Sequence, residues 1–391
     1  MDNSYYDIIK LIKSVLDDKA LELSDEFDIN EISKIAKRHQ IITLVYYGAL
    51  KCGILPTEQA MQEMFVRVVK DTMVDKKQNA EIIKLLDCFN KEKISYMPLK
   101  GVLLKKMYPK PEMRPMGDVD ILINTAQYDE IKPIMQGLGY QETAESDHEL
   151  IWTKSGMCVE LHKRIVSSYN KDFYSYFGDG WKFAKNCNGT CYSMTEEDKF
   201  VYLFTHFSKH YRGTGIGLRH IVDLWVHKKY NPNMDESYIK NALKKLNLDI
   251  FYENILKTLS VWFDDGEQDA ITEFITSVIL SNGVYGNRQS TILASALKES
   301  KKTGNSKDVR VKRILGNAFP PYNIMKEKFP SLKKVPILLP LFWVVRIINT
   351  FLFKRKQLEG KINEYKIISS QQIDSYKEGL NFVGLDFNFK E

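Results

Sequence analysis

The sequence predicts an α+β protein in which a central region of strands and short helices lies between two helical regions. Apolar side chains recur at helical spacing in residues 4–75 and again after Thr195, whereas residues 94–162 carry short apolar runs with strand periodicity, broken by glycine and proline. We therefore expect three parts: an N-terminal helical region (1–75), a core (76–192) and a C-terminal helical domain (193–391).

The helical regions are predicted from apolar spacing and from their ends. Ile32, Ile35 and Ala36 share one helical face, and Gly53 and Pro56 end that segment. A long helix follows and runs to about Lys91. Later, Thr195 with Asp198 resembles a helix cap, and Phe200, Leu203, Phe204 and Phe207 form one apolar stripe behind it. Further helices are expected at 216–229, 236–263 and 267–281.

The central region has a different periodicity. We expect a strand at 94–99, a helix at 101–108, a proline-rich loop at 109–117, a strand at 118–124, and a helix at 127–138 that Pro133 bends or breaks. Three more strands are expected at 139–143, 149–154 and 157–162, the last two joined by a Lys-Ser-Gly turn.

Composition narrows the class of protein. The chain has 391 residues and a formal net charge of +6, which permits nucleic acid or another anionic partner without requiring one. The opening Met1-Asp2-Asn3-Ser4 lacks the basic and apolar stretches of a secretion signal. With five cysteines, an odd number, we expect reduced thiols and a cytoplasmic location.

One apolar segment, 335–353, permits two interpretations. Prolines and Arg346 interrupt it, so it is short of the roughly 20 apolar residues that a spanning helix needs, and we expect no stable membrane insertion. It is either a core helix of the last domain or a surface-lying membrane helix followed by Lys354-Arg355-Lys356. The sequence favours the core helix, and with it no binding to anionic liposomes.

The most informative pattern is a pair of aspartates, Asp118 and Asp120, at the start of a buried strand. Alternate side chains of a strand point the same way, so the two carboxylates leave one face roughly 7 Å apart. Burying two negative charges together is costly, and a divalent cation is the usual resolution. Oxygen ligands suit Mg²⁺ or Mn²⁺. The segment therefore predicts metal-dependent phosphate chemistry.

Other residues can complete such a site. Glu160 shares a strand face with His162 and can supply a third carboxylate, which would allow two metal ions about 3.5–4 Å apart. Gly101 follows the strand ending at Leu99 and would let backbone N–H groups approach a phosphate. Lys100 and Arg114 add positive charge for a triphosphate, although Arg114 could instead pair with Asp118.

The order of these motifs resembles a known family. The chain resembles the polymerase-β-like nucleotidyltransferases in the order of its elements. A strand is followed by Lys100-Gly101, a helix, the run from Arg114 to Ile123 with its Gly117-Asp118-Val119-Asp120, and then Val159 to His162. The closest branch is the uncharacterised nucleotidyltransferases, and the resemblance covers about residues 30–350. In the wider superfamily the phosphate-binding turn carries Gly-Ser or Gly-Gly, whereas here it reads Lys100-Gly101-Val102.

The resemblance implies an α/β nucleotidyltransferase core with a small mixed sheet. It implies transfer of a nucleoside monophosphate from a nucleoside triphosphate to an unidentified acceptor. Asp118, Asp120 and Glu160 would be the catalytic and metal-binding residues, and Lys100, Gly101, Arg114 and Gly117 would bind the nucleotide. Two alternatives stay open: a catalytically degenerate nucleotide-binding scaffold, and another phosphate-transfer enzyme such as a toxin-like RNA-modifying transferase.

Two further pairs lie four residues apart on predicted helices. His206 and His210 could hold a metal or line the nucleotide cleft, although no third ligand accompanies them in the sequence. Arg219 and Asp223 suggest an ion pair within one helix.

Overall fold

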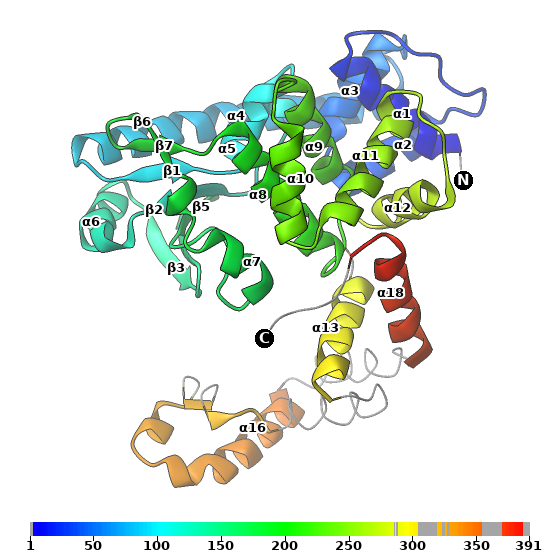
Figure 1. Ribbon diagram of the computed structural model, residues 1–391. Helices are drawn as coiled ribbons and strands as arrows, with labels where there is room; N and C mark the ends of the chain where they lie inside the picture. Colours follow the sequence, from blue (N-terminus) through cyan, green and yellow to red (C-terminus); the bar gives the residue numbers. More distant parts are fainter. Residues whose placement is uncertain are drawn as a thin grey trace. The chain divides into compact units, whose positions relative to one another are not determined.

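The computed structural model describes residues 3–284, 286, 288–303, 319–322, 325–326, 329–353 and 370–385. These residues form two compact units, each described separately below (Figure 1). Unit 1 comprises Met1–Gly286 with Val383–Glu391, and unit 2 comprises Asn287–Phe382. The three-part division expected from the sequence stays a prediction, because these units do not test its boundaries.

Unit 1 is built around one mixed sheet of seven strands, in the order β3-β4-β5-β2-β1-β7-β6. The pairs β2–β5 and β1–β7 are parallel, and the other neighbours are antiparallel. The strands are β1 (Tyr96–Pro98), β2 (Val119–Ile123), β3 (Gln141–Glu145), β4 (Glu149–Lys154), β5 (Met157–His162), β6 (Lys185–Asn188) and β7 (Cys191–Ser193). The expected small mixed sheet is confirmed.

The expected turn between β4 and β5 is present and determines their register. Ser155 and Gly156 both have positive φ, +47° and +81°, the conformation of a two-residue hairpin turn that matches strand twist. Lys154 consequently pairs with Met157, and each residue earlier in β4 pairs with one later in β5, as far as Glu149 with His162.

Helices cover both faces of the sheet. The described helices of unit 1 are α1 (Asn3–Leu16), α2 (Ile29–His39), α3 (Ile42–Lys51), α4 (Gln59–Lys91), α5 (Gly101–Leu104), α6 (Tyr128–Gly137), α7 (Lys171–Phe177), α8 (Glu196–Tyr211), α9 (Leu218–Tyr230), α10 (Glu236–Lys245), α11 (Asp249–Phe263) and α12 (Ala270–Ser281). The helix expected at 236–263 is two helices, because the chain turns at Asn247, whose φ is +54°.

One face of the sheet forms the apolar core with α4 and α6 (Figure 1). Leu85 and Phe89 of α4 and Ile131 of α6 pack with the buried side chains of β2 and β5. Strand alternation assigns Val119, Ile121, Val159 and Leu161 to this core. The intervening side chains of β2 and β5 therefore point to the opposite face, where polar groups gather.

Unit 2 contains α13 (Arg288–Thr303), α16 (Leu339–Phe353) and α18 (Ser370–Phe382). Helices α13 and α18 pack together, with Leu297, Ile373 and Leu380 buried. Within the described ranges, no helix combines the length and the apolar content needed to cross a bilayer.

The buried side chain of His39 joins two helices of unit 1 by a hydrogen bond that requires its neutral form. The Nδ1 of His39, at the end of α2, accepts a hydrogen bond of 3.1 Å from the N–H of Leu218, the first residue of α9. Burial, and the neighbouring Arg38, lower the pKa of His39 to about 4. Protonation would convert this acceptor into a donor facing another donor.

We predict that acid destabilises the protein through this group. In the unfolded chain His39 titrates near pH 6.5, so below that pH the unfolded state binds the proton and the folded state does not. The contribution of neutral His39 is complete above about pH 6.5 and is lost as the pH falls towards about 4, by roughly 1.4 kcal/mol per pH unit. Urea unfolding across this range measures the slope. His39→Gln should be less stable at neutral pH but have a flatter slope; equal slopes in both proteins would contradict the assignment.

Candidate active site

Two of the acidic residues predicted from the sequence lie side by side. In the parallel pair of β2 and β5, Asp120 is directly opposite Glu160, and Leu122 is opposite His162. Because alternate residues share a face, Asp120, Glu160 and His162 project together from the side of the sheet away from α4. The predicted sharing of a face by Glu160 and His162 is therefore confirmed.

The carboxylate of Asp120 is buried at the centre of this group. Its Oδ1 accepts hydrogen bonds of 2.8 Å from Nζ of Lys100 and of 2.8 Å from Nε2 of His162. Burial alone would raise the pKa of Asp120, but Lys100 and His162 outweigh it and hold that pKa below its usual range. His162 Nε2 is also 3.6 Å from Glu160, so it lies between the two carboxylates.

Asp118 immediately precedes β2 and is half-buried. Burial raises its pKa, and the negative charges of Asp120 and Glu160 raise it further. Ligand atoms of Asp120, Glu160 and His162 lie within 4.8 Å of one another. This donor set fits a divalent cation, because the cation would offset the repulsion among the negative charges of Asp118, Asp120 and Glu160. Asp118 itself lies outside that close trio.

The turn before α5 brings Lys100 to the acidic group. Lys100 has a φ of +38°, a conformation that side chains rarely adopt, and such strain is often found at functional positions. At Gly101 the space is tight, because a Cβ there would lie 2.8 Å from Nη1 of Arg114 and 2.8 Å from Sδ of Met116, so one of these side chains would have to shift. A Cβ at Gly117 would meet open space, so no steric contact requires that glycine.

Arg114 is buried and bound to a helix distant in sequence. Its Nε and Nη2 donate to the two carboxylate oxygens of Asp223 in α9, at 3.1 and 2.9 Å, and the hydroxyl of Tyr108 donates to the same carboxylate at 2.7 Å. The sequence suggested that Asp223 pairs with Arg219 in its own helix, but the ion pair observed here joins Asp223 to Arg114. Arg219 donates instead to Gln40 and to the carbonyl of Pro115.

Helix α8 faces the acidic residues with Tyr202, His206 and Lys209. Of these three, only His206 was considered for the site from the sequence. Their spacing of four and three residues places them on one side of the helix. Burial and then the nearby Lys100 lower the pKa of Lys209, whereas the charges of Glu149 and Glu160 oppose that shift. No hydrogen-bond or ion-pair partner of the Lys209 ammonium is found in the part of the chain that the structure describes.

Comparison with protein families now decides what class of protein carries this site. A family model described as uncharacterised nucleotidyltransferase matches residues 25–264. The chain belongs to this family. A comparison with curated proteins gives no match. Among solved structures, the antibiotic-resistance factor ANT(2'')-Ia is similar at 11% sequence identity and a TM-score of 0.33, over 48% of this chain and 97% of that one.

The nucleotidyltransferase has a fourth carboxylate on the same sheet face. Glu149 of β4 is paired with His162 of β5, so it adjoins the acidic group. Its Oε2 lies 3.2 Å from Nε2 of His148, and this contact is the main reason why the pKa of Glu149 is lowered. Glu149 could have been found from the sequence, because the two-residue turn at Ser155-Gly156 determines the register of these strands.

Three histidines of the nucleotidyltransferase form a row, two of them on α8 and the third on α9. The ring centroids of His206 and His210 are 4.4 Å apart, and those of His210 and His220 are 6.0 Å apart. Burial and the neighbouring cations lower the pKa of all three, that of His210 to about 4, so the row is neutral at physiological pH. Within the described residues, these imidazoles join no group that meets the geometry of a metal site.

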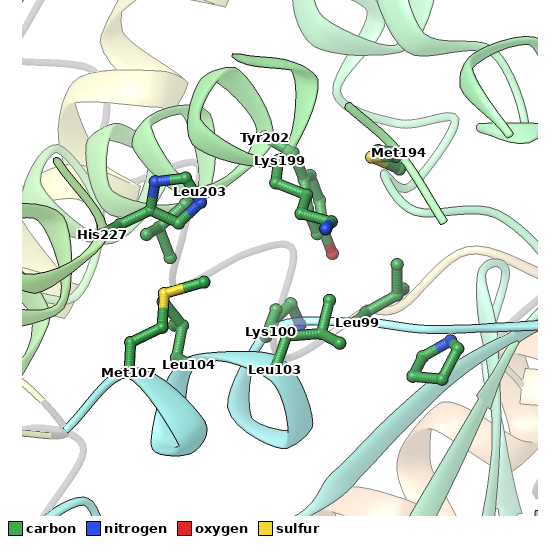
Figure 2. Close-up of a pocket in the computed structure, with 11 residues that line it drawn as sticks. Leu99, Lys100, Leu103, Leu104, Met107, Met194, Lys199, Tyr202, Leu203 and His227 are labelled. Carbon is green, nitrogen blue, oxygen red and sulfur yellow. The ribbon is translucent and has the colours of Figure 1, made fainter. Parts of the chain in front are cut away.

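A mostly apolar pocket adjoins the acidic residues through Lys100 (Figure 2). Figure 2 shows the hydroxyl of Tyr202 directed towards Lys100 from α8. That hydroxyl is buried, and burial raises its pKa to about 12 although the neighbouring Lys100 opposes the shift. The lining is Pro98, Leu99, Lys100, Leu103, Leu104, Met107, Met194, Lys199, Tyr202, Leu203 and His227.

We predict that Asp223→Asn destabilises the nucleotidyltransferase by about 3–5 kcal/mol, because the Arg114 guanidinium would keep its charge in a buried site without a counter-charge. Urea unfolding measures the loss. The double variant Arg114→Met with Asp223→Leu should recover most of it, since both charges are removed together. A loss below about 1 kcal/mol, typical of surface ion pairs, would contradict this account.

Proposed function

We propose that this protein transfers a nucleoside monophosphate from a nucleoside triphosphate to an acceptor, with a divalent metal ion. The observation that carries the proposal is the pairing of Asp120 with Glu160 across β2 and β5, with Asp118 beside them and the ammonium groups of Lys100 and Lys209 nearby. Family membership supports the reaction class.

Asp118, Asp120 and Glu160 would hold the metal, Mg²⁺ or Mn²⁺, which in such reactions lowers the pKa of the acceptor hydroxyl and neutralises charge on the triphosphate. His162 supports this arrangement by donating to Asp120 and thereby orienting its carboxylate. Its position within the same close group explains an imidazole two residues after Glu160, on the same face of β5.

Cationic groups of the chain would bind the phosphates. Lys100 reaches the acidic face from the turn after β1, and Lys209 lies near it on α8. Arg114 uses Nε and Nη2 on Asp223, and its Nη1 lies beside Gly101. We place Arg114, Gly101 and Gly117 along the nucleotide, with Arg114 also holding the Lys100-Gly101 turn in position.

In the reaction, the acceptor oxygen forms a bond to the α-phosphorus and the bond from that phosphorus to the bridging oxygen of pyrophosphate breaks. Glu160, more exposed than Asp120, takes the proton from the acceptor hydroxyl. The products are the nucleotidylated acceptor and pyrophosphate. We place the reaction in the cytoplasm, a location that the five unpaired cysteines support.

The proposal is tested by incubating the protein with cell extract and each of the four labelled nucleoside triphosphates, with and without Mg²⁺. Label should enter one acceptor fraction only when Mg²⁺ is present. Asp118→Asn with Asp120→Asn should abolish the transfer and leave a cooperative melting transition, whereas Asp129→Asn, on the exposed surface of α6, should leave the transfer unchanged. Transfer by the double variant at the wild-type rate would refute the proposal.

Nucleotide binding gives a second prediction. A triphosphate at about a hundred times its dissociation constant should stabilise the protein by roughly 2.7 kcal/mol, and only with divalent metal. Asp118→Asn should reduce the metal-dependent part of the melting shift more than Glu160→Gln, because we place Asp118 at the triphosphate-bound ion. A shift that is independent of Mg²⁺, or equal in wild type and both variants, would contradict the metal-bridged site.

Lys209→Met provides a third prediction, with opposite effects on stability and binding. Burial disfavours the charged form of Lys209, so the variant should melt at a higher temperature than wild type. It should bind triphosphate about 10- to 150-fold more weakly, since one charged hydrogen bond to phosphate contributes roughly 1.5–3 kcal/mol. Lys240→Met, an exposed change on α10, is the matched control. Unchanged triphosphate affinity in Lys209→Met would remove Lys209 from the site.

A further inference from the structure

Helix α16 of unit 2 carries an apolar stripe on its exposed side. Ile337, just before the helix, is 84% exposed, and Leu341, Val344 and Ile348 are 56%, 52% and 51% exposed. Their spacing of four, three and four residues places them on one helical face, and Leu338 and Val345 widen it. Scattered exposed apolar residues are ordinary, but a continuous stripe of this kind marks an interaction surface.

The opposite side of α16 is already used for packing. Phe342 packs on Phe329 with ring centroids 4.8 Å apart, and Trp343 packs on Phe319 at 5.4 Å. Trp343 Nε1 also donates to the carbonyl of Pro320 at 2.9 Å. The helix is therefore held through its aromatic side, and the stripe faces outward. The expectation of a core helix is corrected accordingly: only one side of the segment is packed.

The only charged side chains in the sequence that contains and flanks α16 are positive. Residues 328–358 contain no aspartate or glutamate. Their basic residues are Lys328, Lys333, Lys334, Arg346, Lys354, Arg355 and Lys356. An apolar stripe within a basic segment that has no acidic residues is typical of a helix that lies at the surface of a membrane containing anionic lipids.

We propose that α16 docks unit 2 onto the surface of a bilayer containing anionic phospholipid. The stripe from Ile337 to Ile348 enters the boundary between headgroups and acyl chains, and the net positive charge of residues 328–358 attracts the anionic headgroups. The helix has 15 residues and lies in the plane of the surface rather than across the bilayer. A soluble phosphate would have no use for the apolar stripe, and an ordinary protein partner would not require charge of one sign over 31 residues.

The test is co-sedimentation of the full-length protein with vesicles of phosphatidylcholine alone and of phosphatidylcholine mixed with phosphatidylglycerol. We expect binding to the mixed vesicles only, weakened by salt. Leu341→Ser with Val344→Ser and Ile348→Ser should abolish it. Lys354→Gln with Arg355→Gln and Lys356→Gln should weaken it by about fivefold for each charge removed at low salt.

The matched control is Val66→Ser with Met73→Ser, which removes two apolar side chains on α4 that are 70% and 66% exposed. It should bind the mixed vesicles as wild type does. Wild type that stays in the supernatant with both vesicles would overturn the proposal, as would undiminished binding by the serine triple variant. Light scattering provides the remaining test: a dimer that the triple variant converts to a monomer, without vesicle binding by either, would assign the stripe to self-association instead.

Discussion

Two other parts of the chain meet the buried carboxylate of Asp120 on β2. Lys100 comes from the turn after β1, and β5 contributes both His162 and Glu160, which lies directly across the parallel strand pair. A carboxylate buried in this way is tolerated only with charge-assisted partners, because its desolvation is otherwise too costly. The strained backbone of Lys100 is a consequence, since the turn must deliver an ammonium group to this one oxygen.

A second buried ion pair joins the sheet to the helical region of unit 1. Arg114 lies in the loop before β2 and donates hydrogen bonds to Asp223 of α9. Tyr108 donates to the same carboxylate. Because Nη1 of the same guanidinium lies against Gly101, the position of α9 is connected to the position of the Lys100 turn. Helices α8 and α9 therefore border the candidate site, and α8 places Tyr202 and Lys209 near its charged groups.

Much of the core and of the acidic site could be predicted from local patterns. Strand alternation is sufficient to place Asp120 and Glu160 on one face, and the motif order led to the nucleotidyltransferase family, which the family comparison confirms. Strands β6 and β7 were missed because β6 is wholly exposed and has no apolar alternation to detect. The Arg114–Asp223 pair was missed because it joins residues 109 positions apart, and local spacing offered Arg219 as a nearer partner. Lys209 could not be assigned because nothing in a helix sequence states which polar side faces a sheet.

The parallel pairing of β2 with β5 also has a consequence for how the protein folds. Asp120 and Glu160 are 40 residues apart, and the chain between them, which contains α6 and the β3–β4 hairpin, must close as a loop for β5 to align beside β2. Closing such a loop is slower than forming the local β4–β5 hairpin, which needs only its two-residue turn. The acidic residues are thus brought together by a non-local pairing, so a partly folded chain with intact hairpins would still lack the Asp120–Glu160 pair.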